Sequence, residues 1–303
     1  MTQETLPCLL EPYHPYLPTE RHRELARALL AWALPLCCCQ RGPAWHARSA
    51  FYAAVFGAHC APPGATLHHS LPSARFCLFF LQADDGPAVE LAALAERLRS
   101  GRQTAEGELG VFHDALLDEM RAQRLRTEPF RSALADFCLA TASEPAQNLR
   151  AMTFAEFRAL RRRTVGVLPY IRCWMAVYEM PVPEEGSAAD QLTERTVEVG
   201  HLVNDLASYA TEACGGPGND GNAASNEVLF RAAATGDLPQ AVDTVVDRYN
   251  HLATAFAHAG HGPLPVLLGA IADGNLTGHL GLTATRYPGA TKILRRLHRI
   301  PAL

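Results

Sequence analysis

The sequence predicts an all-α protein, and three observations carry this prediction. Apolar residues recur at steps of three and four over long segments, as they do on amphipathic helices. The alternation of apolar and polar residues that is typical of strands is scarce. Breaks rich in proline and glycine are short and scattered. We expect a single domain over residues 1–303, a helical bundle of about ten to twelve helices without an internal repeat.

The helical segments and the breaks between them alternate along the chain. The clearest periodic stretches cover residues 21–34, 88–101, 108–123 and 238–260. Breaks rich in proline or glycine cover residues 61–65, 180–186, 213–222 and 258–265. None of these breaks has the length of a domain linker, so they are interpreted as turns between neighbouring helices.

Composition and charge exclude several classes of protein. With 48% hydrophobic and 19% charged residues, 303 residues can bury a large core. A net charge of −4 and a pI near 6.3 argue against a nucleic-acid partner, which needs a concentrated basic face. The apolar stretch 28–39 is too short to span a bilayer and contains Pro35, and the N-terminus lacks the charged start of a signal peptide. We therefore expect a cytoplasmic protein without membrane insertion, and we allow for a homodimer.

An acidic pair ends one of the apolar helices. The run from Phe76 to Leu81 is apolar and aromatic, and it is followed by Asp84 and Asp85 before the helix-breaking Gly86-Pro87. Two adjacent carboxylates beside an apolar helix are costly to bury without a cation. The alternative is a helix C-terminus that happens to be acidic, which the helix dipole disfavours. The pair is therefore a candidate metal site.

A second candidate metal site is a stripe of oxygen donors. Asn204, Ser208 and Glu212 recur at steps of four, which on a helix return to the same face with roughly 40° of drift. Hard oxygen donors suit Mg²⁺, which binds few protein groups and leaves positions for water and substrate phosphates. Alternatively, the three residues form the solvated side of an amphipathic helix.

Two further segments supply positive charge. Residues 157–166 contain three successive arginines from Arg161 to Arg163, and the segment 273–287 ends in Arg286-Tyr287. The planar fork of arginine suits bidentate contact with phosphate. A solvated basic face is the alternative for the first segment, since three successive residues point in three directions.

Taken together, these segments resemble class I terpene synthases. Residues 204–212 read ND-x-x-S-x-x-x-E, which is similar to the second metal motif of that family. Asp84-Asp85 corresponds to its first acidic motif, residues 161–166 to its R-R-x-T-x-G segment, and Arg286-Tyr287 to a C-terminal Arg-Tyr pair. The resemblance covers roughly residues 76–287. It implies a helical fold around an apolar cavity and an enzyme that ionises a linear prenyl diphosphate and cyclises the carbocation.

The resemblance also implies which residues hold the metal. In the family, three Mg²⁺ ions grip the diphosphate between two facing helices. Carried over to this sequence, the ligands are Asp84 on one side and Asn204, Ser208 and Glu212 on the other. Asp205 is not a ligand in this pattern. We expect Asp85 to pair with an arginine.

The basic segments receive roles in the same way. Arg161 matches the residue that senses the diphosphate, Thr164 the linker and Val165 the effector residue, whose carbonyl is exposed where the helix breaks at Gly166. Arg286 and Tyr287 match the pair in which the arginine donates to the diphosphate and the tyrosine closes over the site.

The sequence departs from the family in several places. The next acid after the Asp pair, Glu90, lies one place too far, and six residues from Asp84 is about 240° around a helix, so Glu90 joins the site only if the helix unwinds. The usual spacing of the family selects Arg158 as the sensor, whereas the local pattern selects Arg161. Thr211 stands where the family often has lysine, and Gly278 lies near the place of a common tryptophan.

The resemblance implies a prenyl diphosphate as the substrate, and the length of its chain is not encoded in the motifs. Aromatic rings stabilise a carbocation without acting as bases, and we expect Phe79, Phe80 and Trp174 to line the pocket. The small residues Ala207 and Gly278 favour a roomy pocket and the twenty-carbon geranylgeranyl diphosphate. Alternatives are a sesquiterpene synthase using farnesyl diphosphate and a non-catalytic helical protein that binds prenyl diphosphates. A chain-elongating prenyltransferase is disfavoured, because it normally has two Asp-rich motifs.

Overall fold

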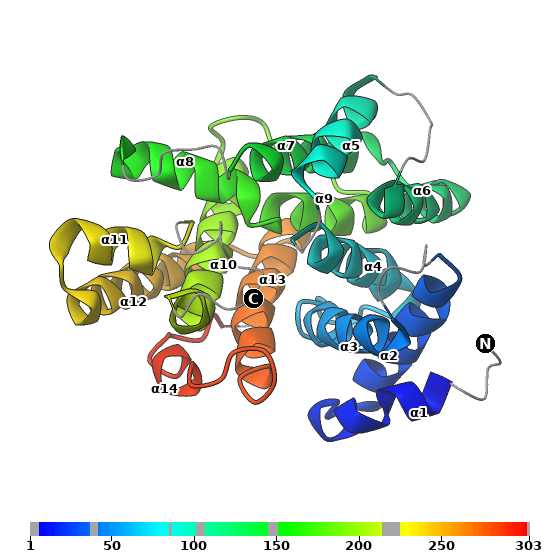
Figure 1. Ribbon diagram of the computed structural model, residues 1–303. Coiled ribbons are helices and arrows are strands. Elements are labelled where there is room, and N and C mark those ends of the chain that lie inside the picture. Colours follow the sequence, from blue (N-terminus) through cyan, green and yellow to red (C-terminus); the bar gives the residue numbers. More distant parts are fainter. Residues whose placement is uncertain are drawn as a thin grey trace.

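The architecture was analysed in a computed structural model that describes residues 6–36, 42–84, 87–100, 107–144, 151–213 and 225–301. Within these ranges there are fourteen α-helices and no strand, which confirms the all-α prediction (Figure 1). The helices are α1 (Leu6–Leu10), α2 (Glu20–Ala33), α3 (Pro43–His59), α4 (Leu67–Asp84), α5 (Ala88–Ser100), α6 (Gly107–Ala122), α7 (Glu128–Ser143), α8 (Phe154–Thr164), α9 (Val167–Val177), α10 (Ala188–Ala213), α11 (Glu227–Thr235), α12 (Leu238–Thr254), α13 (Pro263–Gly281) and α14 (Thr291–Leu294). Three short 3₁₀ segments are η2 (Glu11–Tyr16), η3 (Leu34–Leu36) and η7 (Ala255–His258).

The long helices pack against one another around a central space. Helix α10 packs along α13, α3 packs between α2 and α4, and α9 contacts α4, α7 and α10 (Figure 1). Helices α11 and α12 pack together on one side, away from α5 and α6. Buried apolar residues from Leu10 to Ile300 form one continuous cluster. The two candidate metal segments therefore lie on α4 and α10, which belong to the walls of the same bundle.

Local sequence explains where the helices near the site begin and end. Thr153 and Glu156 form a reciprocal capping box at the start of α8. The side-chain oxygen of Asn226 caps α11, and that of Asp237 caps α12. Gly236 ends α11 in a left-handed conformation, with φ of 73°. Helix α4 is described as far as Asp84, and Gly86, where the sequence predicts a helix break, lies outside the described residues.

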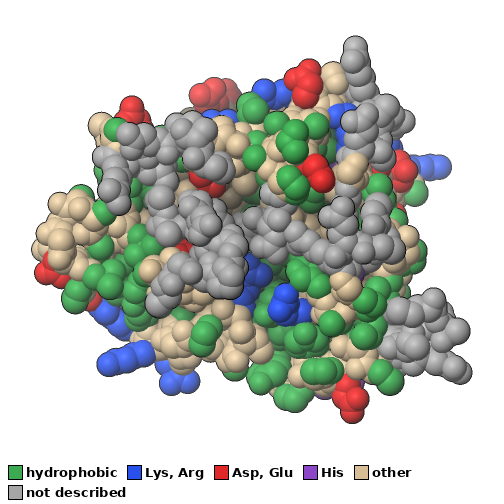
Figure 2. Space-filling model, in the orientation of Figure 1, with side chains coloured by type: hydrophobic (Ala, Val, Ile, Leu, Met, Phe, Trp, Pro, Cys, Tyr) green, Lys and Arg blue, Asp and Glu red, His purple; other side chains and the backbone are tan. Residues whose placement is uncertain are grey.

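The surface gives two further findings. Figure 2 shows the face of Figure 1, on which Lys and Arg side chains lie near the centre among hydrophobic ones. Among the described helices, none combines the length and the apolar character that a membrane span requires.

Candidate active site

A cavity lies among the helices of the bundle, and its wall combines an aromatic part with a polar part. Five aromatic side chains contribute: Phe56, Phe76, Phe80, Tyr170 and Tyr287. The polar wall includes all three residues of the oxygen stripe together with Arg161, Arg286 and His279. The wall is built by α3, α4, α7, α8, α9, α10 and α13 and by the segment after α13.

The oxygen stripe lies on one face of α10 and faces the cavity. The Ser208 hydroxyl donates to the Asn204 carbonyl over 2.8 Å, and Glu212 accepts from the side chain of Asn226 over 2.9 Å. Burial raises the pKa of Glu212, with smaller opposing contributions from Ser208 and Arg161. A buried carboxylate of this kind is stabilised by a neighbouring cation.

These donors fit Mg²⁺. Among the described residues, no three His, Cys, Asp or Glu side chains are grouped so that they could hold a metal ion. The stripe instead offers an amide, a hydroxyl and a carboxylate oxygen, the hard donors that Mg²⁺ prefers.

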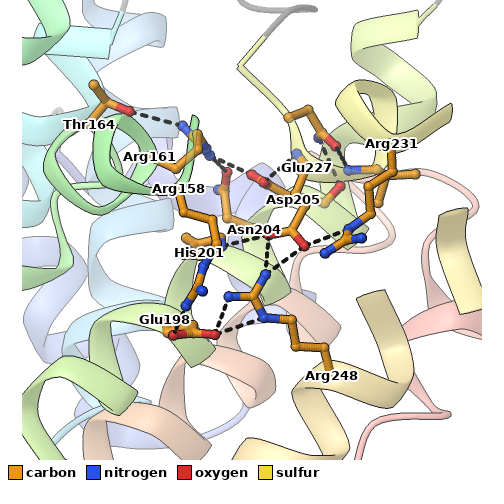
Figure 3. A network of polar contacts seen from close by, with 12 residues as sticks. Arg158, Arg161, Thr164, Glu198, His201, Asn204, Asp205, Glu227, Arg231 and Arg248 are labelled. Atoms are coloured by element: carbon orange, nitrogen blue, oxygen red, sulfur yellow. Dashed lines mark hydrogen bonds and ion pairs between the residues drawn. The ribbon is translucent and has the colours of Figure 1, made fainter. Parts of the chain in front are cut away.

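Arg161 is buried at the end of α8, next to Asn204 and Asp205 of α10 (Figure 3). Its guanidinium donates to Asp205 over 2.5 Å, to Asn204 over 3.4 Å and to Thr164 over 3.3 Å. Burial lowers the pKa of Arg161, but the nearby carboxylates, Asp205 first, outweigh it and hold the pKa above its ordinary value. Arg161 is therefore a permanent positive charge on the cavity wall.

The rival sensor, Arg158, lies elsewhere. Its guanidinium donates to Glu198 over 2.6 Å, it is partly exposed, and it does not line the cavity.

Asp205 is fully buried and accepts from Arg161 and from the backbone N–H of Glu227 over 2.7 Å. Its two oxygens are thus used inside the protein rather than in the cavity.

The helix break that the sequence predicts is present. Helix α8 ends at Thr164, Gly166 has a φ of 71°, and α9 begins at Val167. A Cβ at Gly166 would lie 2.4 Å from the ring of Phe80, so glycine is needed for both conformation and space. The residue four positions after Val165 is Pro169, which has no N–H, so the usual helical bond to the Val165 carbonyl cannot form. Thr164 and Val165 both line the cavity.

The Arg-Tyr pair follows α13 and also reaches the wall. The guanidinium of Arg286 lies 5.3 Å from the ring centre of Tyr52 and 5.7 Å from that of Tyr287. The Tyr287 ring stacks on His279, with 5.1 Å between ring centres. Both residues of the pair are therefore next to the polar wall.

Phe80, one of the three rings expected in the pocket, lines the cavity, whereas Phe79 and Trp174 are fully buried and are not among the residues that line it. On α4 the wall is formed by Phe76, Cys77, Phe80 and Leu81, and Phe79, which lies on another side of the helix, is buried in the core. Trp174 lies one turn beyond Tyr170 on α9 and packs edge-on against the Tyr170 ring, fully buried.

The acidic pair remains a prediction. Asp84 is the last residue of α4 and Asp85 lies outside the described residues. Glu90 lies on α5 and does not line the cavity. Its carboxylate is close to Gly107, where an added Cβ would be 2.7 Å from Oε2.

Several residues of the site were missed in the sequence. His279 is buried on the wall, and burial, together with the charge of Arg286, lowers its pKa to about 4 although its bond to the Asn275 carbonyl opposes the shift. Asn226 contacts the stripe from α11. A helix-capping pattern at Asn226 could have been recognised in the sequence, but its contact with α10 could not, because helical periodicity does not predict which residues of different segments meet.

Comparison with known proteins agrees with this geometry. Solved structures with similar folds include 2-methylisoborneol synthase from Streptomyces coelicolor A3(2), with 19% identity, a TM-score of 0.65 and coverage of 90% of this chain and 93% of that chain. Another is linalool/nerolidol synthase from Streptomyces clavuligerus in complex with 2-fluorogeranyl diphosphate, with 19% identity, a TM-score of 0.61 and coverage of 88% and 98%. At this identity the likeness shows the fold, which is the helical fold of class I terpene synthases. No match was found among curated protein sequences.

The family follows from the sequence itself. Residues 91–253 match the family model described as terpene synthase family 2, C-terminal metal binding. The match spans more than half of the 303 residues. The chain therefore belongs to this family of class I terpene synthases and is an enzyme, as its motifs predicted.

Proposed function

We propose that the protein is a Mg²⁺-dependent terpene cyclase that ionises a linear prenyl diphosphate and closes the resulting carbocation into a ring. The observation that carries this proposal is the pairing, on one cavity wall, of the Asn204, Ser208 and Glu212 oxygens with the buried guanidinium of Arg161. Oxygen ligands for Mg²⁺ next to a fixed guanidinium are suited to binding a diphosphate.

Each group has a role in this proposal. Asn204, Ser208 and Glu212 would hold Mg²⁺ from α10 and Asp84 from α4, with three ions expected when diphosphate is bound. Bound Mg²⁺ supplies positive charge that stabilises the departing diphosphate. Arg161 and Arg286 donate to the diphosphate oxygens. The carbon–oxygen bond breaks, its electron pair leaves with the diphosphate, and an allyl cation remains in the cavity.

The aromatic wall would then protect and guide the cation. The faces of Phe56, Phe76 and Phe80 stabilise positive charge but cannot remove a proton. Their packing around the cavity also limits access of water to the cation. Ring closure and transfer of a proton from the cation to the released diphosphate would complete the reaction, so the shape of the cavity selects the product.

The length of the prenyl chain is a separate question. The expectation of geranylgeranyl diphosphate depends on space beside Ala207 and Gly278. Ala207 does not line the cavity, and the space beside Gly278 is filled by the Phe56 ring, which lies 2.7 Å from the position of an added Cβ. We therefore favour farnesyl diphosphate, with geranylgeranyl diphosphate as the second candidate. The 2-methylisoborneol synthase structure with Mg²⁺ contains the shorter geranyl-S-thiolodiphosphate, which makes geranyl diphosphate a useful third substrate.

The test is turnover of each prenyl diphosphate. Purified protein is incubated with geranyl, farnesyl or geranylgeranyl diphosphate, in the presence of Mg²⁺ or of a chelator. Release of pyrophosphate is followed in solution, and the terpene products are identified by gas chromatography and mass spectrometry. We expect Mg²⁺-dependent cyclic products, highest with farnesyl diphosphate. Glu212→Ala and Asn204→Ala should abolish turnover, whereas Thr211→Ala, on the exposed side of the same helix, should retain it. Normal product formation by Glu212→Ala at saturating Mg²⁺ would contradict the proposal.

A further inference from the structure

The side-chain amide nitrogen of Asn226 is within hydrogen-bond distance of three oxygen atoms of α10, the helix that carries the candidate metal ligands. The side chain is buried, with 1% of its surface exposed. Its Nδ2 lies 2.9 Å from Glu212 Oε2, 3.3 Å from Ser208 Oγ and 2.9 Å from the Asp205 carbonyl oxygen. Two of these acceptors belong to side chains of the oxygen stripe.

The orientation of the Asn226 amide is determined by the other end of its side chain. The Oδ1 atom accepts from the backbone N–H groups of Val228 and Leu229, over 3.0 and 3.4 Å, and so caps α11. Backbone N–H groups only donate, so they must face the oxygen of the amide and not its nitrogen. The NH₂ group is therefore directed at α10, where all three neighbours accept.

The segment that carries Asn226 is itself held in place. The next residue, Glu227, donates its backbone N–H to Asp205 over 2.7 Å. Its carboxylate is fully buried and lies 3.2 Å from the ring of His201. The same carboxylate accepts hydrogen bonds from Arg248 over 2.9 Å and from Arg231 over 2.8 Å (Figure 3). The start of α11 is thus anchored to α10 and α12, and Asn226 has little freedom to move away from the stripe.

We propose that Asn226 is a positioning residue for the metal site, an inference that rests on the proposed function. Glu212 has a long side chain, and ordering such a side chain costs rotamer entropy. A hydrogen bond to Oε2 restrains the carboxylate before a cation arrives and leaves Oε1 for coordination. The same NH₂ group restrains the Ser208 hydroxyl. Partners of metal ligands typically change metal affinity by about 10- to 100-fold when they are removed.

The test separates this role from the capping of α11. Asn226→Ser and Asn226→Thr keep a side-chain oxygen that can cap the helix but lack the NH₂ donor that reaches Glu212. Asp237→Ser is the matched control, because Asp237 caps α12 over 2.9 Å and is distant from the stripe. Two quantities are measured: the melting temperature without ligand, and the dissociation constant for inorganic pyrophosphate with Mg²⁺ by calorimetry.

We expect both Asn226 variants to bind Mg²⁺ and pyrophosphate about 10- to 100-fold more weakly, with melting temperatures close to that of Asp237→Ser. Asp237→Ser should bind like the unmodified protein. Unchanged affinity in a folded Asn226 variant, alongside lost affinity in Glu212→Ala, would overturn the role of Asn226 alone. Unchanged affinity in both would instead overturn the proposed metal site.

Discussion

At the scale of single residues, helical periodicity predicted which side chains share one face of a helix. Asn204, Ser208 and Glu212 share a face because steps of four return to it, and the structure has all three on the cavity wall. Asn226 and Phe56 could not be predicted in the same way. Their importance comes from contacts with α10 and with Gly278, which lie far from them in the sequence, and no local pattern encodes such contacts.

The two candidate sensor arginines make different contacts, which gives a prediction. Arg161 donates to three groups on or behind the cavity wall, whereas Arg158 pairs with Glu198 away from it. Lysine keeps the charge but loses the planar fork. We expect Arg161→Lys to lower kcat by about tenfold or more, equivalent to about 1.4 kcal/mol, and Arg158→Lys to have a smaller effect. Steady-state kinetics of the two variants decide this, and a larger loss from Arg158→Lys would reverse the assignment.

At the scale of elements, helix ends were the most informative features. The break between α8 and α9 was predicted from Gly166, and the end of α4 from Gly86-Pro87. For the aromatic positions, periodicity shows which residues share a face of a helix but not which face meets the cavity. Phe80 and Phe79 are neighbours on α4, and only Phe80 reaches the wall.

The break at Gly166 can be tested against a matched glycine. Gly166 and Gly236 both have a left-handed conformation, with φ of 71° and 73°, but only Gly166 is close to another side chain, the ring of Phe80. An L-residue in this conformation costs roughly 1–2 kcal/mol. We expect Gly236→Ala to lower the melting temperature without changing turnover per folded molecule. Gly166→Ala should lower both, because the added methyl group displaces Phe80, and normal turnover in Gly166→Ala would exclude this role of the break.

The end of α4 separates the two acidic candidates. Asp84 is the last residue of α4, and Glu90 lies on α5 beside Gly107. If Asp84 is the ligand on this side, Asp84→Asn should lower turnover severely and Glu90→Gln should have a mild effect. Initial rates over a range of Mg²⁺ concentrations measure both. Equal losses in the two variants would mean that Glu90 also reaches the diphosphate.

At the scale of the whole molecule, the fold class followed from periodicity and the absence of strand patterns, because both reflect how apolar surface is buried. What periodicity could not predict is the buried ionic network between α8, α10, α11 and α12. Glu198 pairs with Arg158 and Arg248, and Glu227 pairs with Arg248 and Arg231 (Figure 3). This network joins α10, which carries the candidate metal ligands, to α11 and α12. The ion pairs that stabilise the bundle therefore also hold the candidate site in place.

The network predicts how stability depends on pH. Burial alone would raise the pKa of Glu227, but the hydrogen bond and charge of His201, the charge of Arg248 and the bond from Arg231 outweigh it and lower the pKa to about 2. Between the unfolded value of 4.5 and about 2, the unfolded chain binds the proton more tightly than the folded protein. The stabilisation is therefore complete above pH 4.5 and is lost as the pH falls toward 2.

Glu227→Gln removes this charge and tests the linkage. We expect the variant to lose on the order of 3 kcal/mol of unfolding free energy at pH 7, and the difference from the unmodified protein to shrink steadily below pH 4.5. Denaturant unfolding at several pH values measures both quantities. Glu128→Gln is the control, because Glu128 is exposed and its pair with Arg131 lies on the surface, where such pairs contribute little. The opposite result is that the free energies of unfolding of Glu227→Gln and the unmodified protein differ by the same amount from pH 7 to pH 3. That result would show that the loss of stability comes from packing and not from the buried charge.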